Sequence, residues 1–556
     1  MPSDAGFTKN ILRNIPLSKP QVNQPLPTSK KELQGLLRAQ QQGTVDDIMQ
    51  ALAPAIEEEI QRQINLGVAQ KVQEILESIR LARHRQFGSS SERQGQLFNE
   101  AEHYANDELF VDPHIDSSPA PAAKAPTRKR GKPRPLPPEL PRIKRIIEHA
   151  QANKPCGCGS PLVKIGEDIS EQLDVIPMKI IVRRTVRPIY ACPKGDSQPI
   201  QASAPAQILP RSNFSAGLLA TLLTVKYADG LPLNRFATVL KRHGVDIPRQ
   251  SLARAVIKTA QALQPLHNLM RDTLLESPII HMDETTVQVL KEKGRNPTSK
   301  SYMWVQRAGP PGQSIILFDY EPSRAAKVPL ELLQGWQGYL MTDGYKGYGA
   351  IGSATGVTAL ACMAHARRRF VEAQRAQPKG KTGRADEALR YFAKLYRIER
   401  EIKALTLDER TKRRQTESKA VLVELHDWLE ENIRIVTPRS KLGVALAYLQ
   451  KMWPQLQRYT ERGDLPIDNN PCENAIRPFV VGRKAWLFSD TPAGAHASAV
   501  IYSLVETAKA NGKEPQAWLH YALERLPLVK NADEMEQLLP WNTSDEDLAM
   551  NLMASE

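Results

Sequence analysis

The chain has 556 residues, and its 75 Lys and Arg residues exceed its 61 Asp and Glu residues to give a formal net charge of +14. This length exceeds what one hydrophobic core supports and predicts three or four folding units, while the basic balance favours nucleic acid as a partner over a merely soluble basic protein. The sequence lacks both the run of about 18 apolar residues that crosses a bilayer and the apolar core of a signal peptide, so we expect a cytoplasmic protein with no membrane partner.

The N-terminal part of the chain divides into a polar segment and a helix. Residues 1–43 are polar and contain several prolines, which predicts a flexible N terminus. Residues 44–100 place apolar side chains at intervals of three to four, which predicts a long amphipathic helix. The same spacing fits a coiled-coil seam that would join copies of the chain into a homo-oligomer. A helix packed on its own chain is the alternative, and both stay open.

Residues 101–141 are rich in proline and basic side chains, and we expect a linker because this composition cannot bury a core. Its stretch RKRGKPRP is similar to an AT-hook, which lies along the minor groove of DNA. The side chains that would make this contact are Arg128, Arg130, Lys132 and Arg134. Plain attraction to the phosphates is the alternative.

Residues 142–200 carry three closely placed cysteines, Cys156, Cys158 and Cys192, which predict a small zinc-knuckle-like domain. A structural zinc site takes four ligands, and the sequence offers three thiols. Zn²⁺ is therefore a doubtful cofactor, and the alternative is a knuckle that folds without metal.

Residues 205–275 are rich in leucine and alanine and predict a helical, helix-turn-helix-like segment with its turn at Gly244. Arg249, Gln250 and Arg254 would face outward at the start of the second helix, where a recognition helix meets DNA. An ordinary helical hairpin is the alternative.

From residue 276 the pattern changes to short strands with a helix between them, which predicts an α/β core, a mixed sheet flanked by helices. Asp283 lies in one apolar strand and Asp343 ends another. A charge in such a strand is costly unless a partner such as a divalent cation neutralises it. If the two strands are neighbours, the acids could hold Mg²⁺ or Mn²⁺ at the sheet edge, whereas Glu284 would point to the opposite face.

The stretch LPIDNNPCENAIRPF opens a further helix and contains a third acid, Glu473. One interpretation is a capping box, in which Asn470 is the N-cap and Glu473 occupies N3. The other is that Glu473 joins the two aspartates as a metal ligand. Three carboxylates can hold two ions roughly 4 Å apart, the arrangement that serves phosphodiester cleavage.

Four stretches in this order, HMDET, YLMTDGYKGY, CMAHARRRF and DNNPCENAIRPFVVGRKAWLF, resemble transposases of the insertion-sequence-66 family. The resemblance implies a DDE-type DNA transposase with a ribonuclease-H-like core over residues 276–500. It also implies that Asp283, Asp343 and Glu473 are catalytic and bind two Mg²⁺ or Mn²⁺. The family's zinc motif has two C-x-x-C pairs, and this chain departs from it.

The acids are unevenly spaced, since 473 − 343 gives 130 residues between the last two. We therefore expect a helical insertion at about 376–460, and a C-terminal helical tail over 501–556. Basic side chains near the acids are candidates for phosphate contacts, with a solvated helix face as the alternative. These are His365, Arg367, Arg368, Arg477, Arg483 and Lys484.

The combined hypothesis is a bacterial, nucleoid-associated transposase that binds the terminal inverted repeats of its element and catalyses metal-dependent cleavage and transfer of double-stranded DNA. It would act as a homo-oligomer, with accessory proteins of the element as possible partners. Two rivals stay open: a metal-dependent nuclease or resolvase on the same core, and a DNA-binding regulator or inactive relic whose acids hold no metal.

Overall fold

The computed structural model describes residues 75–81, 180–190, 200–310, 312–377 and 382–555. The chain forms two compact units, one of residues 110–204 and one of the remaining residues 1–109 and 205–556. Several predictions lie outside the described residues. These are the flexible N terminus, most of the long helix, the linker with Arg128, Arg130, Lys132 and Arg134, and the cysteines Cys156, Cys158 and Cys192.

Two short segments represent the smaller unit. Strands β1 (Ile189–Tyr190) and β2 (Ile200–Gln201) pair antiparallel, with Tyr190 opposite Ile200. Arg187 reinforces the pair by donating to the carbonyl of Ala202 at 2.9 Å.

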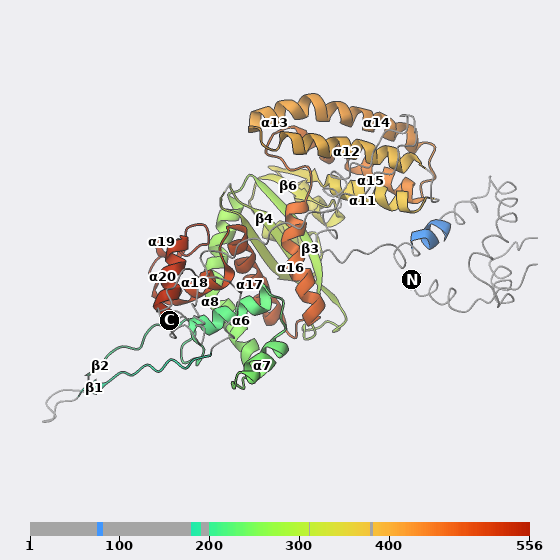
Figure 1. Ribbon diagram of the computed structural model, residues 1–556. Helices are drawn as coiled ribbons and strands as arrows, with labels where there is room; N and C mark the ends of the chain where they lie inside the picture. The colour runs from blue at the N-terminus through green and yellow to red at the C-terminus, as the bar shows by residue number, and fades with distance from the viewer. Residues whose placement is uncertain (1–74, 82–179, 191–199, 311, 378–381, 556) are drawn as a thin grey trace, which may run out of the picture. The chain divides into compact units, whose positions relative to one another are not determined.

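A five-stranded mixed sheet is the centre of the larger unit (Figure 1). Its strands are β3 (Ile279–Gln288), β4 (Lys300–Ala308), β5 (Ile315–Glu321), β6 (Gly338–Thr342) and β7 (Val357–Ala361). Their order is β5-β4-β3-β6-β7, in which β3, β4 and β5 form an antiparallel meander and β6 and β7 run parallel to β3. Helices flank this sheet, so the core is α/β with a mixed sheet, as the sequence predicted.

The edge strand β5 is covered by helix α17 (Pro492–Ala510) through polar contacts. Backbone N–H groups of the strand and of the residue before it donate to side-chain oxygens of the helix and of the residue that follows it. The pairs are Phe318 with Ser503, Ile316 with Thr507, and Ser314 with Asn511, at 2.8, 3.0 and 3.2 Å. Four helical residues rise about 6 Å and two strand residues about 6.6 Å, so the two spacings match. The boundary predicted at residue 500, between the catalytic core and the C-terminal tail, falls inside this helix.

Three helices precede the sheet in the chain: α6 (Ala216–Tyr227), α7 (Leu233–Arg242) and α8 (Arg249–Leu275). The turn between α7 and α8 contains Gly244 at φ +84°, a conformation that favours glycine. Helix α8 packs on α17, while α6 packs on α18 (Pro515–Arg525).

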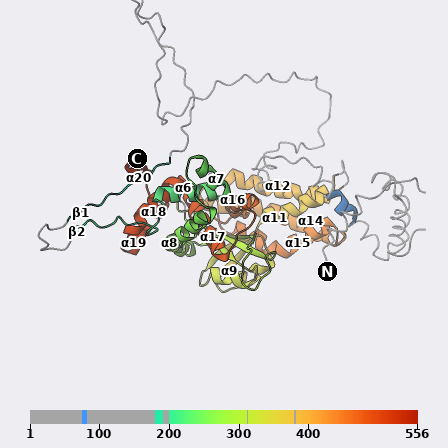
Figure 2. The same cartoon turned by 90° about the horizontal axis from the view of Figure 1, so that it is seen from below.

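The helices between β7 and the last acid form a group beside the β6 and β7 side of the sheet (Figures 1 and 2). They are α11 (Met363–Arg375), α12 (Arg384–Ile402), α13 (Leu407–Arg413), a π-helical turn (Arg414–Ser418), α14 (Lys419–Ile433), α15 (Lys441–Leu456) and a 3₁₀ turn (Gln457–Thr460). Phe370 of α11 packs on Phe392 of α12 and Trp428 of α14, with ring centroids 5.5 and 6.1 Å apart. The same core includes Met341 of β6, so this group is continuous with the sheet.

The remaining elements are short, apart from α16 (Asn470–Trp486), which packs on β3 and β4. They are α9 (Lys327–Leu332), a 3₁₀ turn (Lys346–Tyr348), α10 (Gly349–Gly352), a 3₁₀ turn (Leu526–Leu528), α19 (Ala532–Glu536) and α20 (Asp545–Ser555). Residues 75–81 are helical, and Glu77 of that turn accepts from the backbone N–H of Lys441 at 2.7 Å. Within the described residues, no helix has the length and apolar character needed to cross a membrane.

Candidate active site

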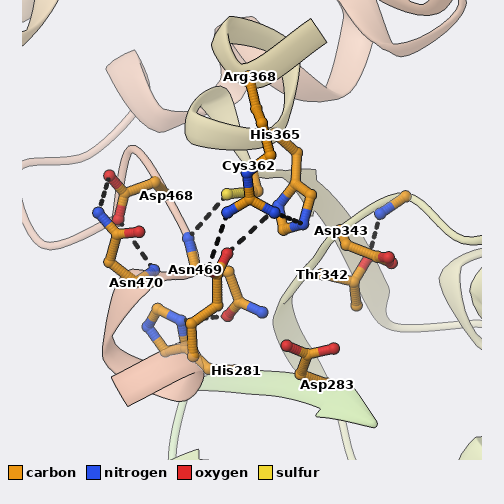
Figure 3. Close-up of polar contacts among 12 residues, drawn as sticks. His281, Asp283, Thr342, Asp343, Cys362, His365, Arg368, Asp468, Asn469 and Asn470 are labelled. Atoms are coloured by element: carbon orange, nitrogen blue, oxygen red, sulfur yellow. Dashed lines mark hydrogen bonds and ion pairs between the residues drawn. The ribbon is translucent and has the colours of Figure 1, made fainter. Parts of the chain in front are cut away.

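The register of the sheet brings two of the three predicted acids together. Parallel pairing of β3 with β6 sets Ile279 opposite Tyr339 and His281 opposite Met341. Two residues farther along the chain are Asp283, still within β3, and Asp343, the residue that follows β6. Because neighbouring strands lie about 4.8 Å apart, the two aspartates are neighbours at one edge of the sheet, as Figure 3 shows.

The turn after β6 fixes the orientation of Asp343. Its Oδ1 accepts from the backbone N–H of Tyr345 at 2.7 Å, and its carbonyl accepts from the hydroxyl of Tyr448 at 2.8 Å. Gly344 follows at φ +76°, and a Cβ there would lie 2.5 Å from Cε of Met452. Since Tyr448 and Met452 belong to α15, the helical group supports the site directly.

Glu473 lies in the first turns of α16 and is only 4% exposed. Arg368 donates through Nη2 to its Oε2 at 3.1 Å, and Nδ1 of His365 lies 3.4 Å from its Oε1. The capping interpretation is wrong. The N-cap is Asn469, one residue earlier than expected, and its side chain makes no capping hydrogen bond.

Asn469 makes hydrogen bonds to β3 and to the residue before α11, which explains why its side chain does not cap α16. Its Nδ2 donates to the carbonyl of Met282 at 3.0 Å, and its backbone N–H donates to Sγ of Cys362 at 3.1 Å. Its Oδ1 therefore faces Nδ1 of His281 at 2.9 Å and accepts a hydrogen bond from the Nδ1–H group. Burial lowers the pKa of His281 to about 4, so this histidine is neutral. The contacts tie α16 to β3 and to the start of α11.

The three acids are close enough for their negative charges to repel one another, and this repulsion affects the pKa of Asp283. Burial raises the pKa of the Asp283 carboxyl well above its usual range. The negative charges of Glu284, Asp343 and Glu473 raise this pKa further. A group of partly buried carboxylates of this kind is unfavourable unless positive charge joins it, and its all-oxygen donor set suits Mg²⁺ or Mn²⁺.

Glu284 is engaged by other side chains, although it neighbours Asp283 in sequence. Its Oε1 pairs with the guanidinium of Arg324, and its Oε2 accepts from the hydroxyl of Tyr348. Burial raises the pKa of Glu284, and these two partners oppose the shift. The carboxylate of Glu284 is therefore bound by Arg324 and Tyr348, and its predicted direction away from the metal site stays a prediction.

Four of the basic residues predicted to contact phosphate are at least partly exposed. Arg368 and His365 lie beside Glu473 with side chains 39% and 22% exposed, and Lys484 is exposed. Arg477 is half-buried. Burial lowers the pKa of His365, which keeps the imidazole neutral at neutral pH.

Two of the predicted phosphate contacts also have roles within the protein. Arg367 is only 6% exposed, because its side of α11 faces the core, so it is withdrawn as a DNA contact. Arg483 uses Nη1 to donate to the hydroxyls of Thr285 and Thr286 at 3.2 and 3.1 Å. It stabilises the end of β3 against α16.

Arg249, Gln250 and Arg254 lie on the exposed side of α8 in its first turns. This is where the sequence places a recognition helix. The sequence did not indicate Tyr448, Asn469 or Cys362 as site residues. The available signal for Cys362 was its position as the first residue of the CMAHARRRF stretch, three residues before His365.

Four family models match the chain. Residues 211–497 match the model described as "Transposase IS66 family". Residues 503–541 match "IS66 C-terminal element", residues 154–194 match "zinc-finger binding domain of transposase IS66", and residues 74–145 match "Transposase C of IS166 homeodomain". The zinc-finger match contains Cys156, Cys158 and Cys192.

The chain is also similar to proteins of Sinorhizobium fredii (strain NBRC 101917 / NGR234). "Uncharacterized protein y4qI" is 32% identical over 413 residues, which cover 72% of this chain and 76% of that protein. "Uncharacterized protein y4hP" is 30% identical over 495 residues, covering 84% and 88%. "Uncharacterized protein y4jD" is 31% identical over 421 residues, covering 73% and 81%.

Proposed function

The chain belongs to the IS66 family of transposases, and from this premise we propose that it binds the terminal inverted repeats of its element and catalyses DNA strand cleavage and transfer. One observation carries the proposal. The register of β3 and β6 brings Asp283 beside Asp343, and the charge of Glu473 acts on the same carboxyl. The sheet order, with two strands parallel to β3 after an antiparallel meander, supports a ribonuclease-H-like fold for this core.

The proposed catalytic residues are Asp283, Asp343 and Glu473, which would hold two Mg²⁺ or Mn²⁺. These ions would activate water and later a 3′-hydroxyl, and would stabilise the leaving oxygen. The chain itself orients the carboxylates: Gly344 and Tyr448 fix Asp343, and Arg368 fixes Glu473.

DNA would be bound by residues from more than one element. Arg368, Lys484, His365 and Arg477 lie on the helices that carry or contact Glu473, and are proposed phosphate contacts. The exposed start of α8, with Arg249, Gln250 and Arg254, is the proposed reader of the terminal repeats. The zinc-finger match supports a further DNA contact in residues 154–194, with Zn²⁺ as its proposed ion.

We further propose that the chain acts as a homo-oligomer, since two element ends must be brought together. The predicted coiled-coil helix would join the copies. Accessory proteins of the element and association with the bacterial nucleoid complete the proposal.

The test uses the full chain, Mg²⁺ and labelled duplexes that cover the DNA flanking its coding sequence on both sides. We expect nicking at the element ends followed by joining to a target duplex. Asp283→Asn should lower cleavage by about a thousandfold or more. The matched control is Asp490→Asn, whose exposed carboxylate pairs with Lys291 at 2.9 Å and should leave cleavage unchanged.

Each other outcome selects a rival. Cleavage without joining would identify a nuclease or resolvase. Binding of the ends without cleavage would identify a regulator or an inactive copy. Cleavage that survives Asp283→Asn would remove the assignment of the three acids.

A further inference from the structure

A second group of potential metal ligands adjoins the proposed catalytic acids. One ligand atom each from Cys362, His365 and Glu473 lies within 4.8 Å of the others. Cys362 immediately precedes α11 and His365 follows one turn later, so both face the same side of the helix start. Glu473 reaches them from α16, and Figure 3 shows Cys362 and His365 close together.

Two polar atoms of this group lack hydrogen bonds. Among the described residues, neither Oε1 of Glu473 nor Nδ1 of His365 has a hydrogen-bond partner, although the two atoms are 3.4 Å apart. Glu473 is 4% exposed, so water does not readily substitute for a partner. A buried acceptor without a partner costs free energy. A cation bound between these atoms would satisfy both once the imidazole proton resides on Nε2, the nitrogen that Arg368 now contacts.

The donor set selects the kind of cation. A thiolate, an imidazole and a carboxylate together are ligands for Zn²⁺, whereas Mg²⁺ prefers oxygen alone. We infer that Cys362, His365 and Glu473 form a site for a thiophilic divalent cation such as Zn²⁺, and that its occupation withdraws Glu473 from the Mg²⁺ site. The second half rests on the proposed catalytic role of Glu473. On binding, the Cys362 thiol releases its proton to solvent as the metal–sulfur bond forms.

To bind the metal, the three ligands must move slightly closer together and the guanidinium of Arg368 must move away. Ligand atoms around a tetrahedral zinc ion are about 3.5 Å apart, so the three side chains must approach by roughly 1 Å. Arg368 contacts two of the ligand side chains, with Nη2 3.1 Å from Glu473 Oε2 and Nη1 3.4 Å from His365 Nε2. Its positive charge opposes a second cation. Because its side chain is 39% exposed, it can turn into solvent when metal binds.

The binding test measures bound metal on the full chain, so that any zinc held by residues 154–194 is common to every sample. We expect Cys362→Ser to retain one Zn²⁺ fewer per chain than the unsubstituted protein after dialysis. Its Co²⁺ form should lose one thiolate-to-metal charge-transfer band. The control is Cys472→Ser, because this buried thiol contacts the carbonyl of Val305 instead and should leave both readouts unchanged.

Two further variants make the result decisive. His365→Gln should weaken the same Zn²⁺ by at least about tenfold, and it carries the test if circular dichroism shows that Cys362→Ser does not fold. Arg368→Gln should tighten binding, because it removes the opposing charge. Equal zinc content and an unchanged Co²⁺ band in both Cys362→Ser and His365→Gln would overturn the site.

The consequence for catalysis is measured separately. Zn²⁺ should lower the Mg²⁺-supported cleavage rate of the unsubstituted protein, and Cys362→Ser should lose this inhibition relative to its own rate without Zn²⁺. Inhibition that persists in Cys362→Ser would refute the withdrawal of Glu473. Absence of Mg²⁺-supported cleavage would refute the proposed function while the metal-binding readouts still decide the site.

Discussion

Asp283 lies among like charges, because Glu284, Asp343 and Glu473 all raise the pKa of its carboxyl. Repulsion of this kind lowers the stability of the metal-free protein, and a bound dication relieves it. The clustering of carboxylates that would bind metal therefore lowers the stability of the metal-free protein. Such a compromise between stability and function is common at active sites.

Removing the Asp283 charge should stabilise the metal-free protein. We expect Asp283→Asn to raise the free energy of unfolding by about 0.5–2 kcal/mol at pH 7 in EDTA, since the substitution keeps the shape and removes the repulsion. Urea denaturation measures this. Asp490→Asn, at an exposed position, should stay within about 0.5 kcal/mol of the unsubstituted protein. A destabilised Asp283→Asn would show that repulsion is not the dominant effect.

Gly344 tests how closely the helical group holds Asp343. Gly344→Ala should cost about 2–4 kcal/mol and lower cleavage, because the residue has φ +76° and its Cβ would meet Cε of Met452 at 2.5 Å. Gly512→Ala is the matched control, since Gly512 has φ +74° with nothing within 4 Å of an added Cβ. It should cost about 1–2 kcal/mol, from backbone strain alone. Equal losses in thermal unfolding would exclude the contact with Met452.

Lys226 provides a pH-dependent prediction. Burial lowers its pKa to about 8, while the rings of Tyr227 and Trp486, 4.7 and 5.5 Å away, partly compensate the charge. The folded state thus binds fewer protons than the unfolded state between pH 8 and 10.5, and stability rises with pH across that window. At pH 7 the ammonium is charged in both states, and its full burial cost applies.

Lys226→Met should therefore stabilise the protein by about 1 kcal/mol at pH 7. This is the part of the free-energy cost of burying the ammonium that the contacts with the two rings do not offset. This advantage should have largely disappeared near pH 10.5. Urea denaturation across the pH range measures it. Lys241→Met, at a position 71% exposed beside Asp246, should show little change at either pH. A gain that grows with pH would have the wrong sign.

Helix α17 stabilises the sheet by covering the open edge of β5. Ser503, Thr507 and Asn511 recur every four residues and meet alternate N–H groups of the strand. Free strand edges promote pairing between chains, so this cover also protects against aggregation. The C-terminal helices therefore act as part of the core.

The double variant Ser503→Ala/Thr507→Val tests this cover. We expect a loss of about 2–4 kcal/mol, because two buried N–H groups lose their acceptors. Thr238→Ala should be nearly neutral, since Thr238 is an exposed threonine of α7 that donates to its own helix at Asn234. Chemical denaturation compares the two. A small loss in the double variant would show that the apolar contacts of α17 suffice.

The net charge of +14 should govern DNA binding by the whole molecule. We expect affinity for an element end to fall steeply with salt. Arg254→Ala should reduce the slope of log K against log[salt] by about 1, as expected for one phosphate contact. Arg397→Ala, on an exposed position of α12, is the control and should leave the slope unchanged. Identical slopes for all three proteins would remove α8 from the DNA interface.

The sequence by itself determined the elements and the family. Periodicity located the strands that carry Asp283 and Asp343 and the helical segment before them, because apolar spacing is a local property of the chain. The ordered motifs identified the transposase family, and the IS66 transposase model matches residues 211–497, which contain all four of them. The roles of the three acids stay predictions.

Only the tertiary structure decided which side chains meet. It withdrew Arg367 as a DNA contact, replaced the capping box at Glu473 with contacts to His365 and Arg368, and brought Cys362 to the same place. Each of these depends on a segment that is distant in sequence and approaches through packing. Local spacing fixes the direction of a side chain on its own element, but it carries no information about the partner that arrives from another.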